Sequence, residues 1–396
     1  MSTLALPRLR DEVVVRPFDD GGTRQRYVVA VDGMHFVVTP TIAAVLDEAR
    51  RGNPDDATFE SLAQRVSHRV GAEITPAQID LLLRERLPRA FFEMLPVPTA
   101  ADEPLMFRRL LLSSTRLQPL LTCAGPLFSI PVALALCLGF LTLDSLLSWQ
   151  IWNQAGALTL TATDHAWGLA LTLVGIFVHE LGHLAACRRF GGEHGGIGVG
   201  VYWCLPAFYA EVHGAWTLPR RQRAAVDAAG VYFQCLFVAM LAGIHLATPQ
   251  PALLSAIVWS HFLMLHTLSP VLKFDGYWLL SDLAGIHNLH QRVCDTARAV
   301  LRGMRPAWPE LRLLGAFIAI AVAYFAYLLI MLGHNLGLST AGFLAAFSAA
   351  GHSIPALLGA AGRGCLLAIL FAMALGVAVL IARATGAVFK ESSNER

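Results

Sequence analysis

The chain has 396 residues, of which 55% are hydrophobic and only 15% are charged. An ordinary soluble domain carries about 25% charged residues, so the composition argues against a wholly soluble protein. The formal net charge is +2, and no Lys/Arg tract is dense enough to indicate nucleic-acid binding. Seven cysteines include no C-x-x-C pair, and most lie in apolar runs, which indicates small buried hydrophobes rather than disulfides.

The first 116 residues are rich in Arg, Asp and Glu and show no signal-peptide pattern. Two β-rich runs in Tyr27 to Val38 flank Asp32-Gly33, a pair that favours a tight hairpin turn. Thr39-Pro40 and Thr75-Pro76 each predict the start of a helix, because Thr caps a helix and Pro suits its first position.

A further amphipathic helix is expected over 58–70. A hairpin followed by three helices predicts a small winged-helix-like domain over residues 1–90. The stretch 91–117 follows as a linker, because its first part has three prolines and mixed charge.

Long apolar runs begin after residue 116. A spanning helix needs about 20 mainly apolar residues, which predicts six transmembrane helices, at roughly 119–143, 166–187, 228–247, 252–272, 311–333 and 364–382. The stretch 338–360 is apolar but rich in small residues and is broken by Pro355, so it could re-enter, lie on the surface or cross as short passes.

The basic residues set the expected orientation. They gather before the first span, after the second, before the third, between the fourth and fifth, and after the sixth. The loops on the other side (146–165, 248–251 and 334–363) contain one basic residue, Arg363. The positive-inside rule therefore predicts that both termini are cytoplasmic.

One motif in the second span carries titratable groups. His179-Glu180-Leu181-Gly182-His183 matches H-E-x-x-H, in which two histidines share one helical face and can hold one zinc ion. Glu180 then lies where it can take a proton from zinc-bound water. Ionisable residues are costly inside a membrane and mark function by default, so this reading is favoured over two histidines that only hydrogen-bond neighbouring helices.

A catalytic zinc usually has three protein ligands and one open position, so a third ligand must come from elsewhere. Candidates are Asp275, Glu211, His194, His213, His261 and His266. Asp275 is preferred because Gly276 allows a close backbone approach and Pro270 can end the fourth span before it.

These motifs resemble the site-2 protease group (the M50 family) of intramembrane zinc metalloproteases. The resemblance covers about 166–283 and rests on H-E-x-x-H in one span and Asp-Gly in a later segment. It implies that Asp275 is the third zinc ligand. The group usually has asparagines where this chain has Thr267 and Ser269, and its Gly-Pro-x-x-Asn motif reads Gly230-Val231-Tyr232-Phe233-Gln234 here.

A bacterial branch of that group, with a PqqD-like domain before the peptidase, is more similar still. The stretches Pro206 to Phe233 and Lys273 to Asp282 resemble it, and PqqD-like domains bind leader peptides of ribosomally made, modified peptides. The resemblance implies a peptidase core over 118–290, further transmembrane helices over 291–396 and a place in the bacterial inner membrane.

The expected fold is thus mostly α: a polytopic membrane protein with about six transmembrane helices behind a small α+β cytoplasmic domain. The expected function is zinc-dependent hydrolysis of a peptide or membrane-anchored segment, with the bilayer and peptide-export components as further partners. The alternative is an accessory protein for peptide maturation or export that binds without cutting. The glycine-rich stretch 190–212 is either a hairpin that pairs with an extended substrate or a flexible loop. Val45, Leu46 and Ile42 of the first helix are expected to line pockets for a leader peptide.

Overall fold

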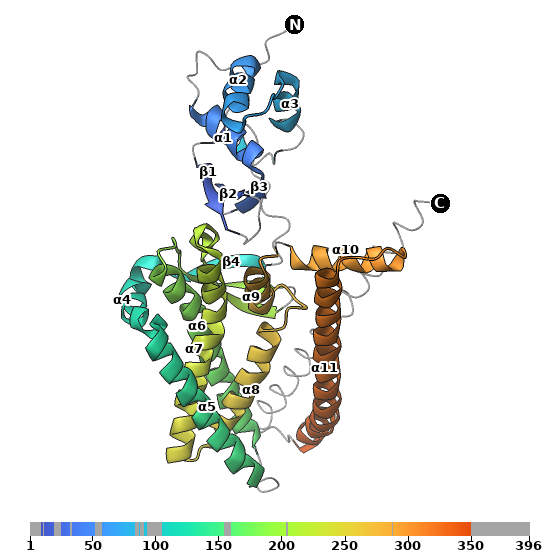
Figure 1. Ribbon diagram of the computed structural model, residues 1–396. Helices are drawn as coiled ribbons and strands as arrows, with labels where there is room; N and C mark the ends of the chain where they lie inside the picture. Colours follow the sequence, from blue (N-terminus) through green and yellow to red (C-terminus); the bar gives the residue numbers. More distant parts are fainter. Residues whose placement is uncertain are drawn as a thin grey trace.

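The structure is a computed structural model in which the N-terminal domain stands at one end of a helical bundle (Figure 1). It describes residues 9–10, 12–19, 25–31, 34–51, 58–83, 87, 91–92, 105–153, 160–202, 205–286 and 288–349. This part of the chain is mostly helical and contains two small antiparallel sheets.

The N-terminal domain combines a three-stranded sheet, in the order β1-β2-β3, with three helices. The elements are β1 (Val14–Phe18), β2 (Arg26–Val31), β3 (Met34–Val38), α1 (Pro40–Arg51), α2 (Phe59–Val70) and α3 (Pro76–Leu81). The expected pairing of the two β-rich runs is confirmed, with Val29 opposite Phe36. The Asp32-Gly33 turn lies outside the described residues, and β1 is a strand that the sequence reading did not anticipate.

The helix starts follow from local capping. The side chain of Thr58 accepts a hydrogen bond from the backbone N–H of Ser61, and Thr75 forms a reciprocal capping box with Gln78. The helices pack on the sheet around a core that includes Val45 and Leu46, each 1% exposed. The expectation that these two residues line a peptide pocket is therefore wrong, since they stabilise the domain itself; Ile42 is only partly buried.

A second sheet, in the order β4-β5-β6, lies at the N-terminal-domain end of the bundle (Figure 1). Its strands are β4 (Leu105–Leu112), β5 (Ile197–Tyr202) and β6 (Leu205–Ala210). The glycine-rich stretch thus contains a hairpin, because β5 and β6 pair along their whole length. The stretch expected as a linker, 91–117, also supplies β4, whose apolar and basic run pairs with β5.

Four helices of the described chain contain segments long and apolar enough to cross a membrane. They are α5 (Ile130–Asn153), α6 (Ala162–Arg189), α7 (Arg220–Ala247) and α11 (Trp308–Ala349). A fifth apolar helix, α8 (Pro251–Thr267), is shorter, and the expected sixth span at 364–382 lies outside the described residues. The first span was expected at 119–143 but runs over 130–153.

Proline explains that shift. The helix α4 (Ser114–Ala124) ends at a 3₁₀ turn, η4 (Gly125–Phe128), whose Pro126 has no N–H to continue an α-helical ladder.

The last helix also differs from expectation, because α11 continues through the start of the 338–360 stretch to Ala349.

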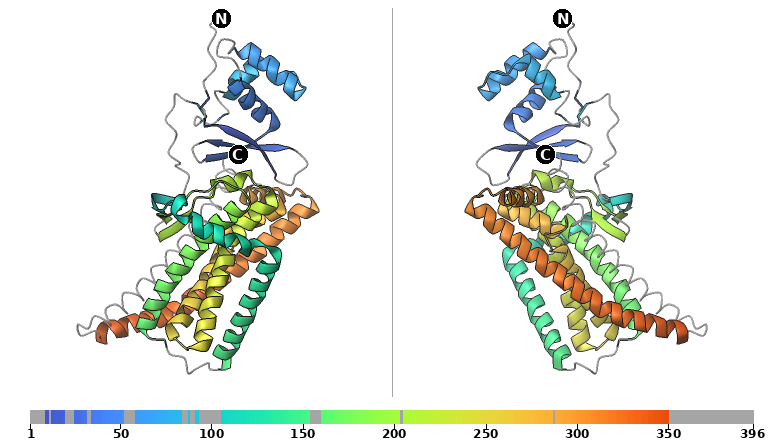
Figure 2. Two further views of the ribbon diagram at one scale, coloured as in Figure 1. Left: turned by 90° about the vertical axis from the view of Figure 1, so that its left-hand side faces the viewer. Right: turned by 90° about the vertical axis from the view of Figure 1, so that its right-hand side faces the viewer.

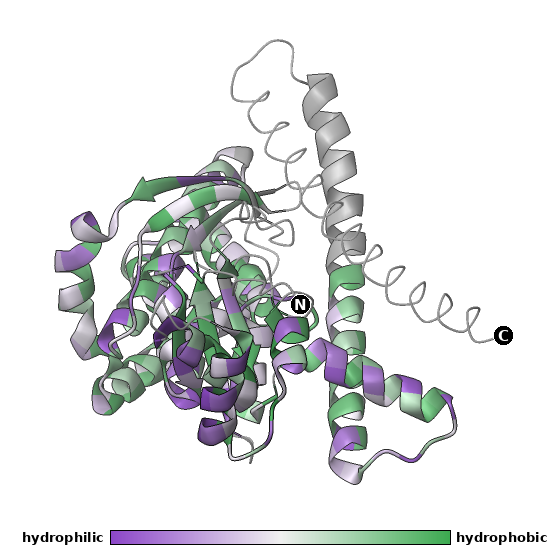
Figure 3. Ribbon diagram, turned by 90° about the horizontal axis from the view of Figure 1, so that it is seen from above, coloured by the Kyte–Doolittle hydropathy of each residue, from purple (hydrophilic) through white to green (hydrophobic). Residues whose placement is uncertain are grey.

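The helices divide into inner and outer members. In the apolar stretches of α6 and α7, 50% and 56% of the residues are buried, whereas only 6% are buried in those of α5 and α11. Seen from the side, α5 to α8 run alongside one another and α11 crosses obliquely (Figure 2). The coloured part of α11 is predominantly hydrophobic and stands beside the bundle (Figure 3). Exposed apolar helices of this kind suit contact with lipid.

Three short elements complete the described chain: η5 (His213–Thr217), α9 (Asp275–Ala284) and α10 (Leu289–Leu301). The loop between α8 and α9 places the start of α9 against α7, and this arrangement forms the candidate site.

Candidate metal centre

The motif residues lie on the inner helix α6. His179 and His183 are 7% and 8% exposed, and their Nε2 atoms are 3.1 Å apart. The expected sharing of one helical face is therefore confirmed. Neighbouring helices cover this face, since α6 contacts both α7 and α8.

Asp275 reaches the two histidines from a different part of the chain. Its Oδ2 lies 2.9 Å from His179 Nε2 and 3.2 Å from His183 Nε2. α8 ends near Leu268, and Asp275 is the first residue of α9. The close approach depends on Gly276, because a Cβ there would lie 2.0 Å from the carbonyl oxygen of Leu268.

The three donor atoms have the spacing that a metal needs. Ligands about 2.0–2.1 Å from zinc at tetrahedral angles stand about 3.3 Å apart. The observed separations are 2.9, 3.1 and 3.2 Å. His179, His183 and Asp275 therefore fit three corners of a zinc site, as a mixed nitrogen and oxygen donor set that suits this ion.

Helix α7 fixes the geometry of that donor set. The Nδ1 of His183 donates to the carbonyl oxygen of Val226 at 2.8 Å, which leaves Nε2 free of a proton to bind metal. Gly230 faces the two imidazoles at close range: a Cβ there would lie 2.4 Å from His183 Nε2 and 2.5 Å from His179 Nε2. The absent side chain thus leaves the space that the ion would need.

Glu180 lies beside the second sheet. Helix α6 contacts β6, and the backbone N–H of Ala210, the last residue of β6, faces the Glu180 carboxylate. The candidate base is therefore next to the strand that forms one edge of the β4-β5-β6 sheet.

The other candidates for a third ligand have partners elsewhere. Glu211 pairs with Arg108 at 3.8 Å, and His261 pairs with Asp144 at 3.1 Å. The remaining three also lie in other contacts: His194 with the Gly195 carbonyl oxygen, His213 with the ring of His35, and His266 with the Tyr324 hydroxyl. Among the described residues, Asp275 alone of the six joins the histidine pair.

A cavity of about 410 Å³ lies beside this centre, between the N-terminal domain and the bundle. Phe18 of β1 lines it from one side, and Ala210 and Asp227 line it from the core. Asp227 directly follows Val226, so the cavity and the metal centre share the same turn of α7.

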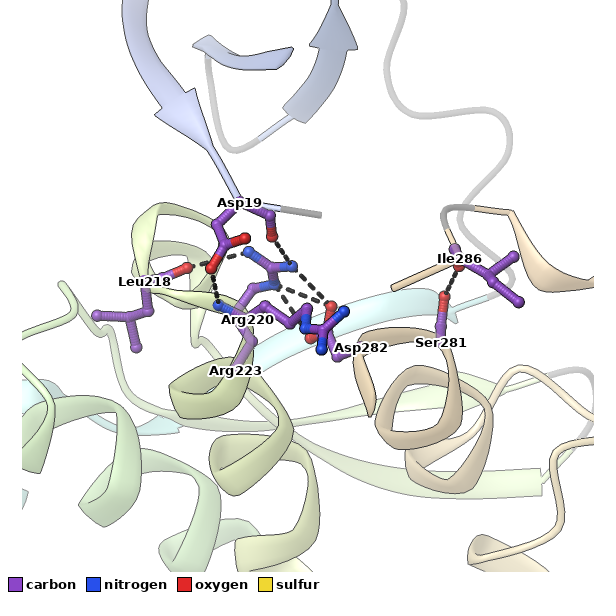
Figure 4. A network of polar contacts seen from close by, with 7 residues as sticks. All are labelled: Asp19, Leu218, Arg220, Arg223, Ser281, Asp282 and Ile286. Atoms are coloured by element: carbon purple, nitrogen blue, oxygen red, sulfur yellow. Dashed lines mark hydrogen bonds and ion pairs between the residues drawn. The ribbon is translucent and has the colours of Figure 1, made fainter. Parts of the chain in front are cut away.

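Arg223 links the domain to the core at the edge of this cavity (Figure 4). Its guanidinium donates to the carboxylate of Asp282 at 2.7 Å and to the carbonyl oxygens of Leu218 at 3.0 Å and Asp19 at 2.7 Å. It also lies over the ring of Phe18, 4.4 Å from the centroid. The sequence reading missed this group, because nothing in the spacing of residues 19, 223 and 282 shows that they meet.

Part of the chain is similar to a known protein. A segment of 128 residues, 31% of the chain, is 27% identical to a Bacillus subtilis (strain 168) protein named "Putative peptide zinc metalloprotease protein YydH". The matched region spans about half of that relative, 51% of its length. No protein-family model and no solved structure matches the chain.

Proposed function

We propose that this chain is an integral-membrane zinc endopeptidase of the site-2 protease type, in which His179, His183 and Asp275 hold the metal. The observation that carries the proposal is the meeting of these three donor atoms within 3.2 Å of one another in a buried site. The partial similarity to a protein named as a zinc metalloprotease supports the same reaction class.

A zinc ion held there would supply a Lewis acid and make water a nucleophile at neutral pH. Glu180 is next to His179 in the chain and on the same helix, so it is the residue proposed to accept the proton from water and return it to the leaving amine. The backbone N–H of Ala210, which faces that carboxylate, would help to keep it in place during the transfer. His183 would keep its orientation through the Val226 carbonyl oxygen.

The substrate is proposed to be an extended peptide or a membrane-anchored segment. The strand β6 is an edge of its sheet in the described chain, and its last residue, Ala210, faces Glu180. A peptide strand added along β6 would obtain main-chain hydrogen bonds and pass beside the candidate base. This supports the reading of 190–212 as a substrate-binding hairpin.

The N-terminal domain is proposed to be PqqD-like and cytoplasmic, and to dock the substrate or its leader. Its open strand β3 offers a second edge for a peptide. The positive-inside pattern supports a bacterial inner-membrane location with both termini on the cytoplasmic side, and peptide-export components remain proposed partners.

The test is hydrolysis by the full-length, zinc-loaded protein. Candidate peptides encoded near the gene are incubated with wild type and with Glu180→Gln, and products are identified by mass spectrometry. We expect cleavage by wild type only, with zinc content unchanged in Glu180→Gln. His179→Ala and His183→Ala should lose zinc, because two remaining ligands hold it poorly; full zinc occupancy in both would overturn the assignment.

The second candidate is an accessory protein that binds a peptide during maturation or export without cleaving it. The contact between the N-terminal domain and the core at Arg223 fits this role as well. An accessory protein would keep its biological function in Glu180→Gln, whereas an endopeptidase would not.

A further inference from the structure

The cavity between the N-terminal domain and the core has aromatic walls. Phe18, Tyr209, Trp216 and Trp278 all line it, and the rings of Trp216 and Trp278 meet edge to face with centroids 5.7 Å apart. Aromatic faces of this kind pack well on an alkyl chain and attract a cation placed over them.

The arginines of the cavity are already neutralised by acidic partners. Arg223 is bonded to Asp282 at 2.7 Å, and Arg108 pairs with Glu211 at 3.8 Å. These pairs therefore add little net charge to the cavity.

Asp227 is the acidic residue of the cavity that stands apart from these pairs. Its Oδ2 is buried and has no hydrogen-bond partner among the residues that the structure describes. A buried carboxyl oxygen without a partner is costly, and Asp227 lines the cavity, so a ligand that brings a positive charge and N–H donors to this carboxyl would be favoured.

The position of the cavity indicates where such a ligand comes from. Tyr209 and Ala210 belong to β6, so a peptide strand added to that edge would pass the mouth of the cavity. Ala210 also faces Glu180, and Asp227 follows the residue that orients His183. A side chain entering the cavity would therefore belong to a residue near the bond to be cut.

We propose that this cavity is a specificity site for a lysine or arginine side chain of the substrate, with the Asp227 carboxyl as its acidic end and Trp216 and Trp278 as its walls. This proposal rests on the proposed peptidase function, which identifies the ligand as part of a substrate. Recognition of the cationic side chain itself does not require turnover.

The test measures binding with the full-length, zinc-loaded Glu180→Gln protein, which cannot use Glu180 to cut a probe. The probes are N-acetyl-arginine methylamide and N-acetyl-lysine methylamide, with the uncharged N-acetyl-citrulline and N-acetyl-norleucine methylamides as their counterparts. Binding is followed by tryptophan fluorescence, because two tryptophans line the cavity, and by calorimetry.

We expect each cationic probe to bind at least about tenfold more tightly than its uncharged counterpart, as a desolvated charge pair can supply. Adding Asp227→Asn should abolish that preference, while Asp295→Asn on α10 should leave it unchanged. Zinc content and melting temperature confirm that each variant is folded.

If Glu180→Gln, with Asp227 intact, binds the arginine and citrulline probes equally, the proposal is overturned. This outcome needs no further variant. A preference that survives Asp227→Asn would overturn the role of this carboxylate. If the preference is present but no peptide is cleaved by the wild type, the cavity proposal stands and the peptidase proposal fails. The two failures are therefore distinguishable.

Discussion

The carbonyl oxygen of Val226 accepts a hydrogen bond from Nδ1 of His183 at 2.8 Å, which joins α7 to the motif helix α6. One turn further along α7, Gly230 leaves room in front of the Nε2 atoms of His183 and His179. Helix α7 thus both orients a candidate ligand and shapes the space in front of it, although it carries no candidate ligand of its own.

Gly230→Ala should therefore weaken metal binding while the protein still folds. The new Cβ would lie within 2.5 Å of both imidazole Nε2 atoms. We expect zinc affinity to fall more than about tenfold, comparable to losing a group that orients a ligand, as measured by elemental analysis and competition with a chelator. Gly243→Ala on the same helix is the matched control, because a Cβ there meets nothing within 4 Å; equal zinc binding by both variants would contradict the role of Gly230.

Asp275→Ala should lower zinc affinity far more than Glu211→Ala. Asp275 Oδ2 lies within 3.2 Å of both histidines, whereas Glu211 is paired with Arg108. Removing a ligand should cost more than about 100-fold in affinity. If Glu211→Ala loses the metal and Asp275→Ala keeps it, the third ligand has been assigned wrongly.

The contrast between Asp275 and Val226 shows how much of the site a sequence can reveal. The i, i+4 spacing of His179 and His183 is a local property of one helix, so it is visible in the sequence. Asp275 was one of six candidates, and Gly276 and Pro270 favoured it. The Val226 carbonyl and the Ala210 N–H are backbone groups that any residue carries, so no residue pattern could have identified them.

The same limit applies to the fold. Apolar length predicted α6, α7 and α11, and the capping threonines predicted the N-terminal helices. The first span was placed too early because the apolar run continues through Pro126. Apolar length alone does not show that one helix ends there and that the next begins at Ile130. The pairing of β4 with β5 joins strands more than 80 residues apart, and local pattern does not encode such a partner.

Arg223→Met should destabilise the folded protein. Arg223 is 4% exposed and is hydrogen-bonded to Asp282. Burial raises the pKa of the Asp282 carboxyl, and the bond to Arg223 opposes that rise. Breaking a buried ion pair from one side costs about 3–5 kcal/mol, so the melting temperature in detergent should fall by several degrees. Arg221→Met, at an exposed position of the same helix, is the control; similar melting temperatures for both would contradict this role.

The fold around the turn that leads to Asp275 should lose stability in mild acid. His290 Nε2 donates to the carbonyl oxygen of Pro270 at 3.0 Å, and its ring lies 4.4 Å from that of Tyr277. Burial, together with the charge of Lys273, lowers the pKa of His290. A histidine with a lowered folded pKa contributes stability above its unfolded pKa of about 6.5, and that stability is lost as the pH falls through the folded value.

His290→Gln should therefore flatten the fall in melting temperature between about pH 7 and pH 5, because glutamine does not titrate. His68→Gln, at an exposed site on α2, should leave the fall unchanged. Comparing each variant with wild type removes every contribution to the acid response that the three proteins share. An unchanged slope in His290→Gln would show that this residue does not control the acid response.

The N-terminal domain should fold alone and bind a leader peptide without the metal centre. Its buried residues form one cluster that closes within the domain and runs from Val13 to Phe92. Phe91 is fully buried and its carbonyl oxygen accepts the backbone N–H of Arg10, so the fragment must end at residue 92 rather than 90. A leader could add to the edge strand β3 by main-chain hydrogen bonds. Residues 1–92 are titrated with leader peptides encoded near the gene, alongside full-length His183→Ala, which should bind as wild type does. A folded fragment that binds none of them would show that the domain only caps the membrane part.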